Sequence, residues 1–290
     1  FTLFIVFVVV FIIMSLLSPQ HFLGATNLQS MAFQMAEFGI LAFAMMVVIL
    51  TGGINLSLTY NASLSGVVMA LVMRDMHANG ASPAASIITG IAAALAVAVL
   101  CGLLNGFLVA YFKVTPILAT LGTMTLFKGI GLNLTQGYSI SGFPKVFDIF
   151  GNGTVAGVPV SCLIFILIVV VMWFLLEKTP WGIQVHMAGN NPIALEYSGV
   201  NVNKVLFKVY ITSALLCFFA TLIMTSRYNS MKPEYGYSYL LQSVLAVVLG
   251  GTSINGGYGK VAGTLLSILI LQVLSSGLNI FCVNKFFIEV

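Results

Sequence analysis

Nine apolar stretches, separated by short polar connections, run along almost the whole of this chain. A helix needs about 20 largely apolar residues to cross a bilayer. The stretches cover residues 2–17, 31–50, 56–73, 84–104, 115–134, 160–176, 205–225, 240–249 and 261–280. Because lipid offers the backbone no hydrogen-bond partners, spans of this kind are helical. The sequence therefore predicts an all-α polytopic membrane protein.

The charge content leads to the same class of protein. Only 6% of the 290 residues are charged and 60% are hydrophobic, with a mean hydropathy of +1.09. Soluble domains carry about 25% charged residues, so this chain has too few charged side chains to form a water-exposed surface. We expect one transmembrane domain over residues 1–290. The eighth stretch is too short to cross alone, and residues 286–290 predict the start of a tenth, truncated span.

Residues that could carry chemistry do not cluster. The histidines and cysteines are far apart, at His21, His77 and His186 and at Cys101, Cys162, Cys217 and Cys282. No metal pair, Ser–Lys pair or Asp dyad appears within the spans, and no Walker A motif occurs anywhere. We expect no enzyme activity and no cofactor in this chain. If transport is active, another subunit must supply the energy.

Two glycine pairs interrupt the apolar pattern. The segment 51–57 reads Thr-Gly-Gly-Ile-Asn-Leu-Ser, and a second Gly-Gly break covers residues 249–257. Paired glycines release the backbone from helical geometry, and Asn or Ser can cap a restarted helix. Breaks in both halves of a membrane protein point to repeated halves and a solute path between them. The alternative is that the glycines form turns or allow close helix packing.

The candidate path residues are polar and uncharged, which suits weak hydrogen bonds to a neutral hydroxylated solute. They are Gly52, Gly53, Asn55, Ser57 and Asn61 on one side, and Gln242, Ser243 and Thr252 on the other.

The most polar part of the chain is the segment 177–204. Within it, residues 192–198 predict a short helix with Asn191 as N-cap, Pro192 at the first helical position and Gly199 as the stop. Such a helix is either a surface loop or a docking element for a soluble partner.

Charge does not orient the chain, because inner and outer loops hold five Lys or Arg residues each.

Glu37 and Lys128 are ionisable residues inside predicted spans, where charges are expensive and mark function or paired structure. Glu37 lies near the start of the second span, and we expect it to snorkel to the interface. For Lys128, pairing, snorkelling and contact with a solute all remain open.

Several motifs resemble one known family. The segment 51–57 is similar to the Thr-Gly-Gly-Ile-Asp-Leu-Ser signature of the sugar permeases of ATP-binding-cassette importers. The similarity continues, in the family's order, at Asn105-Gly106, at residues 116–124, at 189–191 with Ala194, at 198–202, and at 246–257 with 263–265. It therefore covers nearly the whole chain.

The resemblance implies about ten spans, a cytoplasmic amino end and a fold like that of the vitamin B12 importer permease. It makes the segment 177–204 a cytoplasmic loop whose coupling helix rests in a groove of the ATPase. The implied coupling residues are Asn191, Pro192, Ala194, Leu195, Glu196, Ser198 and Gly199.

The function implied is that of a multi-pass permease subunit in the bacterial inner membrane, importing a sugar or sugar-like solute. The implied partners are a separate ATPase that binds ATP and Mg, a second identical or paralogous permease, and a periplasmic solute-binding protein. No nucleic-acid partner is expected. The rival interpretation, an ion-coupled secondary transporter, would need carboxylates along the path, and only Glu37 lies well within a span.

Three departures from the family pattern leave the solute open among sugars, polyols, nucleosides and furanosyl signals. Asn55 replaces the signature aspartate, Leu240 and Gln242 stand where acidic or amide residues are common, and Tyr60-Asn61 replaces small residues. We therefore expect a path nearly free of fixed charge.

Overall fold

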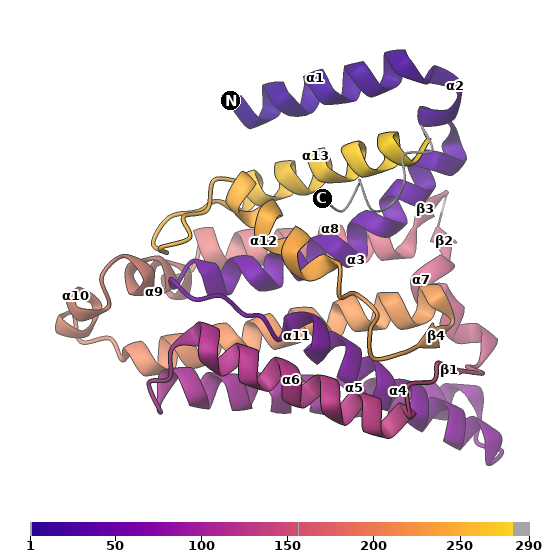
Figure 1. Ribbon diagram of the computed structural model, residues 1–290, viewed down its shortest axis with the longest axis horizontal. Helices are drawn as coiled ribbons and strands as arrows, with labels where there is room; N and C mark the ends of the chain where they lie inside the picture. Colours follow the sequence, from indigo (N-terminus) through magenta and orange to yellow (C-terminus); the bar gives the residue numbers. More distant parts are fainter. Residues whose placement is uncertain (1, 156, 281–290) are drawn as a thin grey trace.

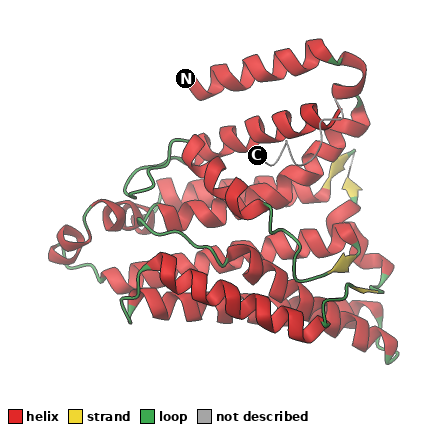
Figure 2. Cartoon of the chain, viewed as in Figure 1, coloured by secondary structure: helices red, strands yellow, loops and turns green. Residues whose placement is uncertain are grey.

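The computed structural model describes residues 2–155 and 157–280, and helices form most of it (Figures 1 and 2). The helices are α1 (Thr2–Leu17), α2 (Pro19–Phe22), α3 (Ala25–Ile49), α4 (Leu58–Ala78), α5 (Pro83–Ala110), α6 (Pro116–Thr135), α7 (Ile149–Asn152), α8 (Val160–Glu177), α9 (Pro180–Asn190), α10 (Pro192–Tyr197), α11 (Val202–Tyr228), α12 (Tyr239–Leu249) and α13 (Val261–Ile280). A 3₁₀ turn, η1, covers Lys145–Asp148.

Short strands appear only in the connections of the described chain. The strand β1 (Ile140–Ser141) pairs antiparallel with β4 (Ser230–Met231), so the loop after α6 is tied to the chain leaving α11. The strands β2 (Thr154–Val155) and β3 (Val158–Pro159) form a small antiparallel hairpin before α8.

Six described helices are long and apolar enough to cross a membrane: α3, α5, α6, α8, α11 and α13. The other three predicted spans also form helices but differ in kind. α1 has 16 residues and α12 has 11, while α4 is long but carries buried polar side chains such as Asn61 and Ser65. The prediction of a polytopic helical membrane protein is confirmed, and the expected tenth span at residues 286–290 lies outside the described residues.

Helix α3 forms the centre of the bundle. Its residues from Ala36 to Ile49 are all buried, against α8, α11, α12 and α13. By contrast, α1 has no buried residue and packs on α13 at the margin (Figure 1). Long runs of apolar residues can be exposed in this way only when lipid replaces water around the bundle.

Two helices begin inside the bundle. After α3 the chain turns back through residues 50–57, and α4 starts only at Leu58; after α11 it turns back from the opposite end through residues 229–238 before α12 starts (Figure 1). The break at 51–57 thus interrupts a span, as the paired glycines predict. Its counterpart in the second half precedes α12, whereas the predicted break at 249–257 lies beyond the end of that helix.

The two glycine breaks nevertheless meet. The Gly257 amide donates a hydrogen bond to the Leu50 carbonyl oxygen at 2.9 Å, and Gly52 lies against the backbone of Asn255. The end of α9 closes this contact, because the Gly189 Cα packs directly on the Leu50 carbonyl and the Gly257 amide. Three segments therefore meet through their backbones at the end of the bundle nearest α9 and α10, here called the α10 end.

This close approach makes Gly189 intolerant of a side chain. A Cβ atom at position 189 would collide with backbone atoms of Leu50 and Gly257, which cannot rotate away. We expect Gly189→Ala to lower the free energy of unfolding by about 3 kcal/mol, the upper part of the range for overpacking. Thermal unfolding of the purified permease in detergent measures this loss.

The control is Gly122→Ala on α6, because nothing lies within 4 Å of the added Cβ there. Equal unfolding temperatures for the two variants would contradict the packing described.

Candidate functional site

A buried hydrogen-bond network holds the interrupted segment before α4. The Asn55 Nδ2 donates to Ser213 Oγ of α11 at 3.2 Å. The Ser57 amide and hydroxyl both donate to Asn55 Oδ1, at 3.1 and 2.8 Å. The side chain of Asn55 thus bridges α11 and the first residues of α4, with both of its polar atoms engaged.

The network continues into α5 and α6. Asn105 Nδ2 of α5 donates to Ser57 Oγ at 2.8 Å, and Thr123 Oγ1 of α6 donates to Asn105 Oδ1 at 2.6 Å. Thr120 binds the backbone itself: its hydroxyl donates to the Ile54 carbonyl at 3.0 Å and accepts from the Leu56 amide at 3.1 Å. Backbone groups that a helix would have paired are therefore paired by side chains.

The structure distributes the other predicted path residues over three places. Gly53 is buried against Pro116 and Val48, and Asn61 donates to the Ala98 carbonyl at 3.5 Å. Gly52 and Thr252 lie at the α10 end with the two glycine breaks, where Thr252 packs beside Gly259. Gln242 and the buried Ser243 lie in the first turns of α12. Within the described residues, no hydrogen bond joins the α12 group to Asn55 or Ser57.

Four members of the network were not predicted as site residues. Asn105, Thr120 and Thr123 lie within the motifs that carry the family resemblance, and Ser213 has no sequence signal beyond being a small polar residue in an apolar span. One sequence signal could have found all four: a polar side chain in lipid is costly, so each polar residue within a span must have a hydrogen-bond partner in the protein.

The expectation that Glu37 snorkels to the interface is wrong. Its side chain is 0% exposed, and Arg227 Nη1 lies 3.2 Å from Glu37 Oε1 in an ionic contact without the geometry of a directed hydrogen bond. The hydroxyls of Tyr228 and Tyr239 donate to Glu37 Oε2 at 2.8 and 3.2 Å. The carboxylate therefore ties α3 to the end of α11 and the start of α12.

Removing one charge of this pair should destabilise the protein strongly. Loss of a single partner from a buried ion pair costs about 3–5 kcal/mol, because it strands the other charge. Since Arg227 is 20% exposed and Glu37 is 0% exposed, we expect Arg227→Gln to cost more than Glu37→Gln. The double variant should recover part of the loss, as read from thermal unfolding of all three proteins.

The matched control is Arg74→Gln, which breaks an exposed pair with Asp75; pairs of that kind contribute about 0–1 kcal/mol. Additive losses in the double variant would show that Glu37 and Arg227 do not interact.

The predicted short helix is present as α10. The Asn191 side chain accepts from the Ala194 amide at 3.0 Å, Pro192 is the first helical residue, and Gly199 follows with a φ of +79°. Leu195 is buried, whereas Tyr197 is 89% exposed. The neighbouring helix α9, which is capped by Thr179, does not follow from the sequence pattern described above.

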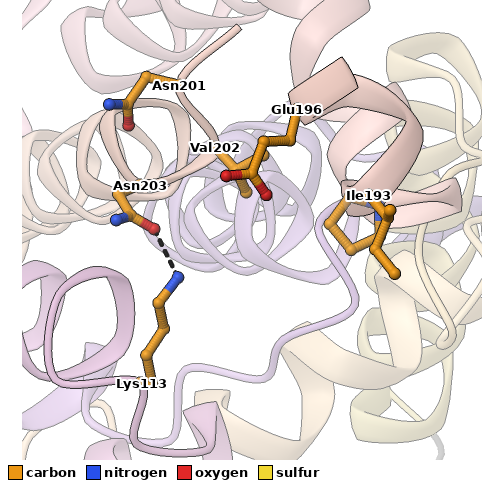
Figure 3. Close-up of a pocket in the computed structure, with 7 residues that line it drawn as sticks. Lys113, Ile193, Glu196, Asn201, Val202 and Asn203 are labelled. Atoms are coloured by element: carbon orange, nitrogen blue, oxygen red, sulfur yellow. Dashed lines mark hydrogen bonds between the residues drawn. The ribbon is translucent and has the colours of Figure 1, made fainter. Parts of the chain in front are cut away.

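A cavity of about 190 Å³ lies beside α10 (Figure 3). Its wall includes Ile193 and Glu196 of α10, Asn201 and Asn203 near the start of α11, and Lys113 from the α5–α6 connection. The Lys113 Nζ donates to Asn203 Oδ1 at 2.7 Å. This end of the molecule therefore presents apolar, acidic and basic groups together. Among the described residues, no group of three or more His, Cys, Asp or Glu side chains could hold a metal ion.

Comparisons with known proteins identify the family. A family model described as the permease component of branched-chain amino acid transport systems matches residues 27–288. The ribose import permease protein of Bacillus subtilis is 39% identical over 278 residues, covering 95% of this chain and 84% of that protein. The corresponding protein of Haemophilus influenzae is 36% identical over 288 residues, covering 98% and 86%.

A second kind of relative is the autoinducer 2 import system permease protein of Escherichia coli. It is 34% identical over 262 residues, covering 87% of this chain and 77% of that protein. No solved structure matches the chain. The family match spans most of the chain and includes both interrupted segments and α10. The chain therefore belongs to this family of multi-pass inner-membrane permeases, which are transport subunits of ATP-binding-cassette importers rather than enzymes.

Proposed function

We propose that this permease imports ribose or a chemically similar uncharged, polyhydroxylated solute. The observation that carries the proposal is the similarity to ribose import permeases over 95–98% of this chain. The buried polar side chains around the start of α4 are uncharged, which agrees with a neutral solute. The similarity to autoinducer 2 permeases favours the wider class of sugar-like solutes.

We propose that the transmembrane domain has ten spans in two halves, arranged as in the vitamin B12 importer permease. The third span of each half, α4 or α12, begins inside the bundle, and the two run in opposite directions (Figure 1). Inverted repeats with discontinuous helices are common in transporters, and the solute site lies where the repeats meet. In this arrangement the α10 end would face the cytoplasm.

We propose that the predicted path residues line the translocation path and change position during transport. Asn55 and Ser57 are hydrogen-bonded to protein in the described conformation, so a solute reaches them only when the interrupted segment shifts. The other predicted path residues lie in or near these breaks: Gly52, Gly53 and Asn61 around the start of α4, Gln242 and Ser243 in the first turns of α12, and Thr252 in the glycine break after α12. Weak, transient contacts there would allow rapid release into the cell.

We further propose that α10 is the coupling helix and acts through α9. Leu195 anchors α10 in the core, and α10 packs on α9. The C-terminal end of α9, next to α10, contacts both glycine breaks, since His186 Nδ1 lies 3.3 Å from the Gly257 carbonyl oxygen and Gly189 packs on Leu50. A push on Asn191, Pro192, Ala194, Glu196 or Ser198 would therefore reach both breaks.

Separate subunits supply the remaining parts in this proposal. An ATPase pair binds ATP and Mg, and a periplasmic binding protein delivers the solute. One α10 per chain implies two permeases. An ion-coupled mechanism is disfavoured because Glu37, a buried carboxylate in the described spans, is committed to Arg227.

Changing the exposed Ala194 to Arg tests the coupling role. A long charged side chain on α10 should block docking, and we expect at least a tenfold fall in ATP-driven ribose uptake with normal amounts of inserted protein. Uptake and ATP hydrolysis are measured in proteoliposomes that contain the complete transporter.

The control is Ala84→Arg, an exposed position at the opposite end of the bundle. Uptake by Ala194→Arg equal to that of this control would rule out the coupling assignment.

A further inference from the structure

Lys128 is a charge inside a span. At 1.5 Å per residue, it lies about 18 Å along α6 from Pro116 and about 10 Å from Thr135, well within a hydrocarbon core about 30 Å thick. Its side chain forms no ion pair with a described carboxylate. The ammonium instead lies 5.8 Å from the centre of the Tyr60 ring, in cation–π geometry. An ionisable group at this depth is a candidate functional group.

A second tyrosine completes the group. The rings of Tyr60 and Tyr237 are tilted at 54° with centroids 6.2 Å apart. Tyr60 belongs to the first turn of α4 and is 4% exposed, whereas Tyr237 precedes α12 and is 59% exposed. We call these three residues the Tyr60–Lys128–Tyr237 cluster. In the described structure, none of their side-chain polar atoms has a hydrogen-bond partner.

The cluster lies where the two interruptions meet α6. Ser63 Oγ of α4 donates to the Pro233 carbonyl at 2.7 Å, which fixes the segment before α12 beside α4. On the other side, Gly131 of α6 faces the Pro233 ring, which a Cβ atom at position 131 would contact at 3.4 Å. The starts of both broken helices and the middle of α6 therefore contribute one residue each.

From this geometry we propose that the Tyr60–Lys128–Tyr237 cluster is a solute-contact site within the membrane, which takes the ring of an uncharged polyhydroxylated molecule. The inference rests on the proposed function and deepens it. A tyrosine ring offers an apolar face to the C–H side of such a ring and a hydroxyl at its edge. The ammonium of Lys128 offers three donors to ring hydroxyls. Tyr60 would form the floor of the site and Tyr237 its exposed wall.

Alternating accessibility of position 237 tests this assignment without knowledge of the natural solute. Tyr237→Cys is made in a chain whose native cysteines are replaced by serine, and the complete transporter is labelled in vesicles with a small charged thiol reagent. A path residue should react in one nucleotide state and at least tenfold more slowly in the other, comparing nucleotide-free with ATP–vanadate. Leu167→Cys, on the exposed apolar face of α8, should not react in either state.

Asn255→Cys distinguishes failure of the proposed function from failure of the cluster assignment alone, because this exposed residue lies at the α10 end, away from the cluster. If neither position responds to nucleotide, both the proposed function and the cluster assignment fail. If position 255 responds but position 237 is unreactive in both states, or forms a disulfide between two permeases in both, only the cluster assignment fails.

Uptake of labelled D-ribose gives an independent readout. We expect Tyr237→Ala and Lys128→Met to reduce ribose transport at least tenfold with normal insertion, and Tyr237→Phe to retain most of it because the ring remains. Tyr138→Ala changes an exposed tyrosine in the connection after α6 and should transport normally. Transport by Tyr237→Ala at the level of Tyr138→Ala would overturn the site.

Discussion

Backbone groups that lie within a membrane-embedded bundle must find partners in the protein, and this requirement governs the architecture described here. The chain gives up helical hydrogen bonds between α3 and α4, and side chains pair the backbone groups that this leaves free. Thr120 binds the Ile54 carbonyl and the Leu56 amide, and Asn55 Oδ1 accepts from the Ser57 amide. Asn105 and Thr123 then hold those side chains in place. Each unsatisfied group would cost several kcal/mol in lipid. The polar network is therefore what allows α4 to begin inside the bundle.

At the end of the bundle opposite the α10 end, a buried ion pair holds the helices together. Glu37 joins α3 to Arg227 and to two tyrosines, and it holds the end of α11 and the start of α12 together. The α10 end is joined differently, by direct contacts between the backbones of Leu50, Gly189 and Gly257. In the coupling mechanism that we propose, a displacement of α9 and α10 would reach both glycine breaks through these contacts.

Local features of the structure followed from sequence, while features that depend on distant residues did not. Apolar length predicted the spans, and the Asn191, Pro192 and Gly199 pattern predicted α10, because both signals are local. The pairing of Glu37 with Arg227 joins residues 190 positions apart, and no local pattern specifies it. The interruption at residues 229–238 has no glycine pair to mark it in the sequence. Tertiary contacts with Ser63 and Gly131 position it instead. The family resemblance supplied the order of the motifs but not the hydrogen bonds that join Asn55 to Ser213 and Asn105 to Ser57.

A double-mutant cycle on Ser57 and Asn105 tests most directly whether the network holds the break. Each alanine substitution should lower the free energy of unfolding by about 1–3 kcal/mol, because it leaves a buried polar partner unsatisfied. Because these two side chains are hydrogen-bonded to each other, the double variant should lose less than the sum of the two single losses, with an interaction energy of about 0.6–1.7 kcal/mol. Losses that add to within about 0.3 kcal/mol, measured by thermal unfolding in detergent, would contradict the account.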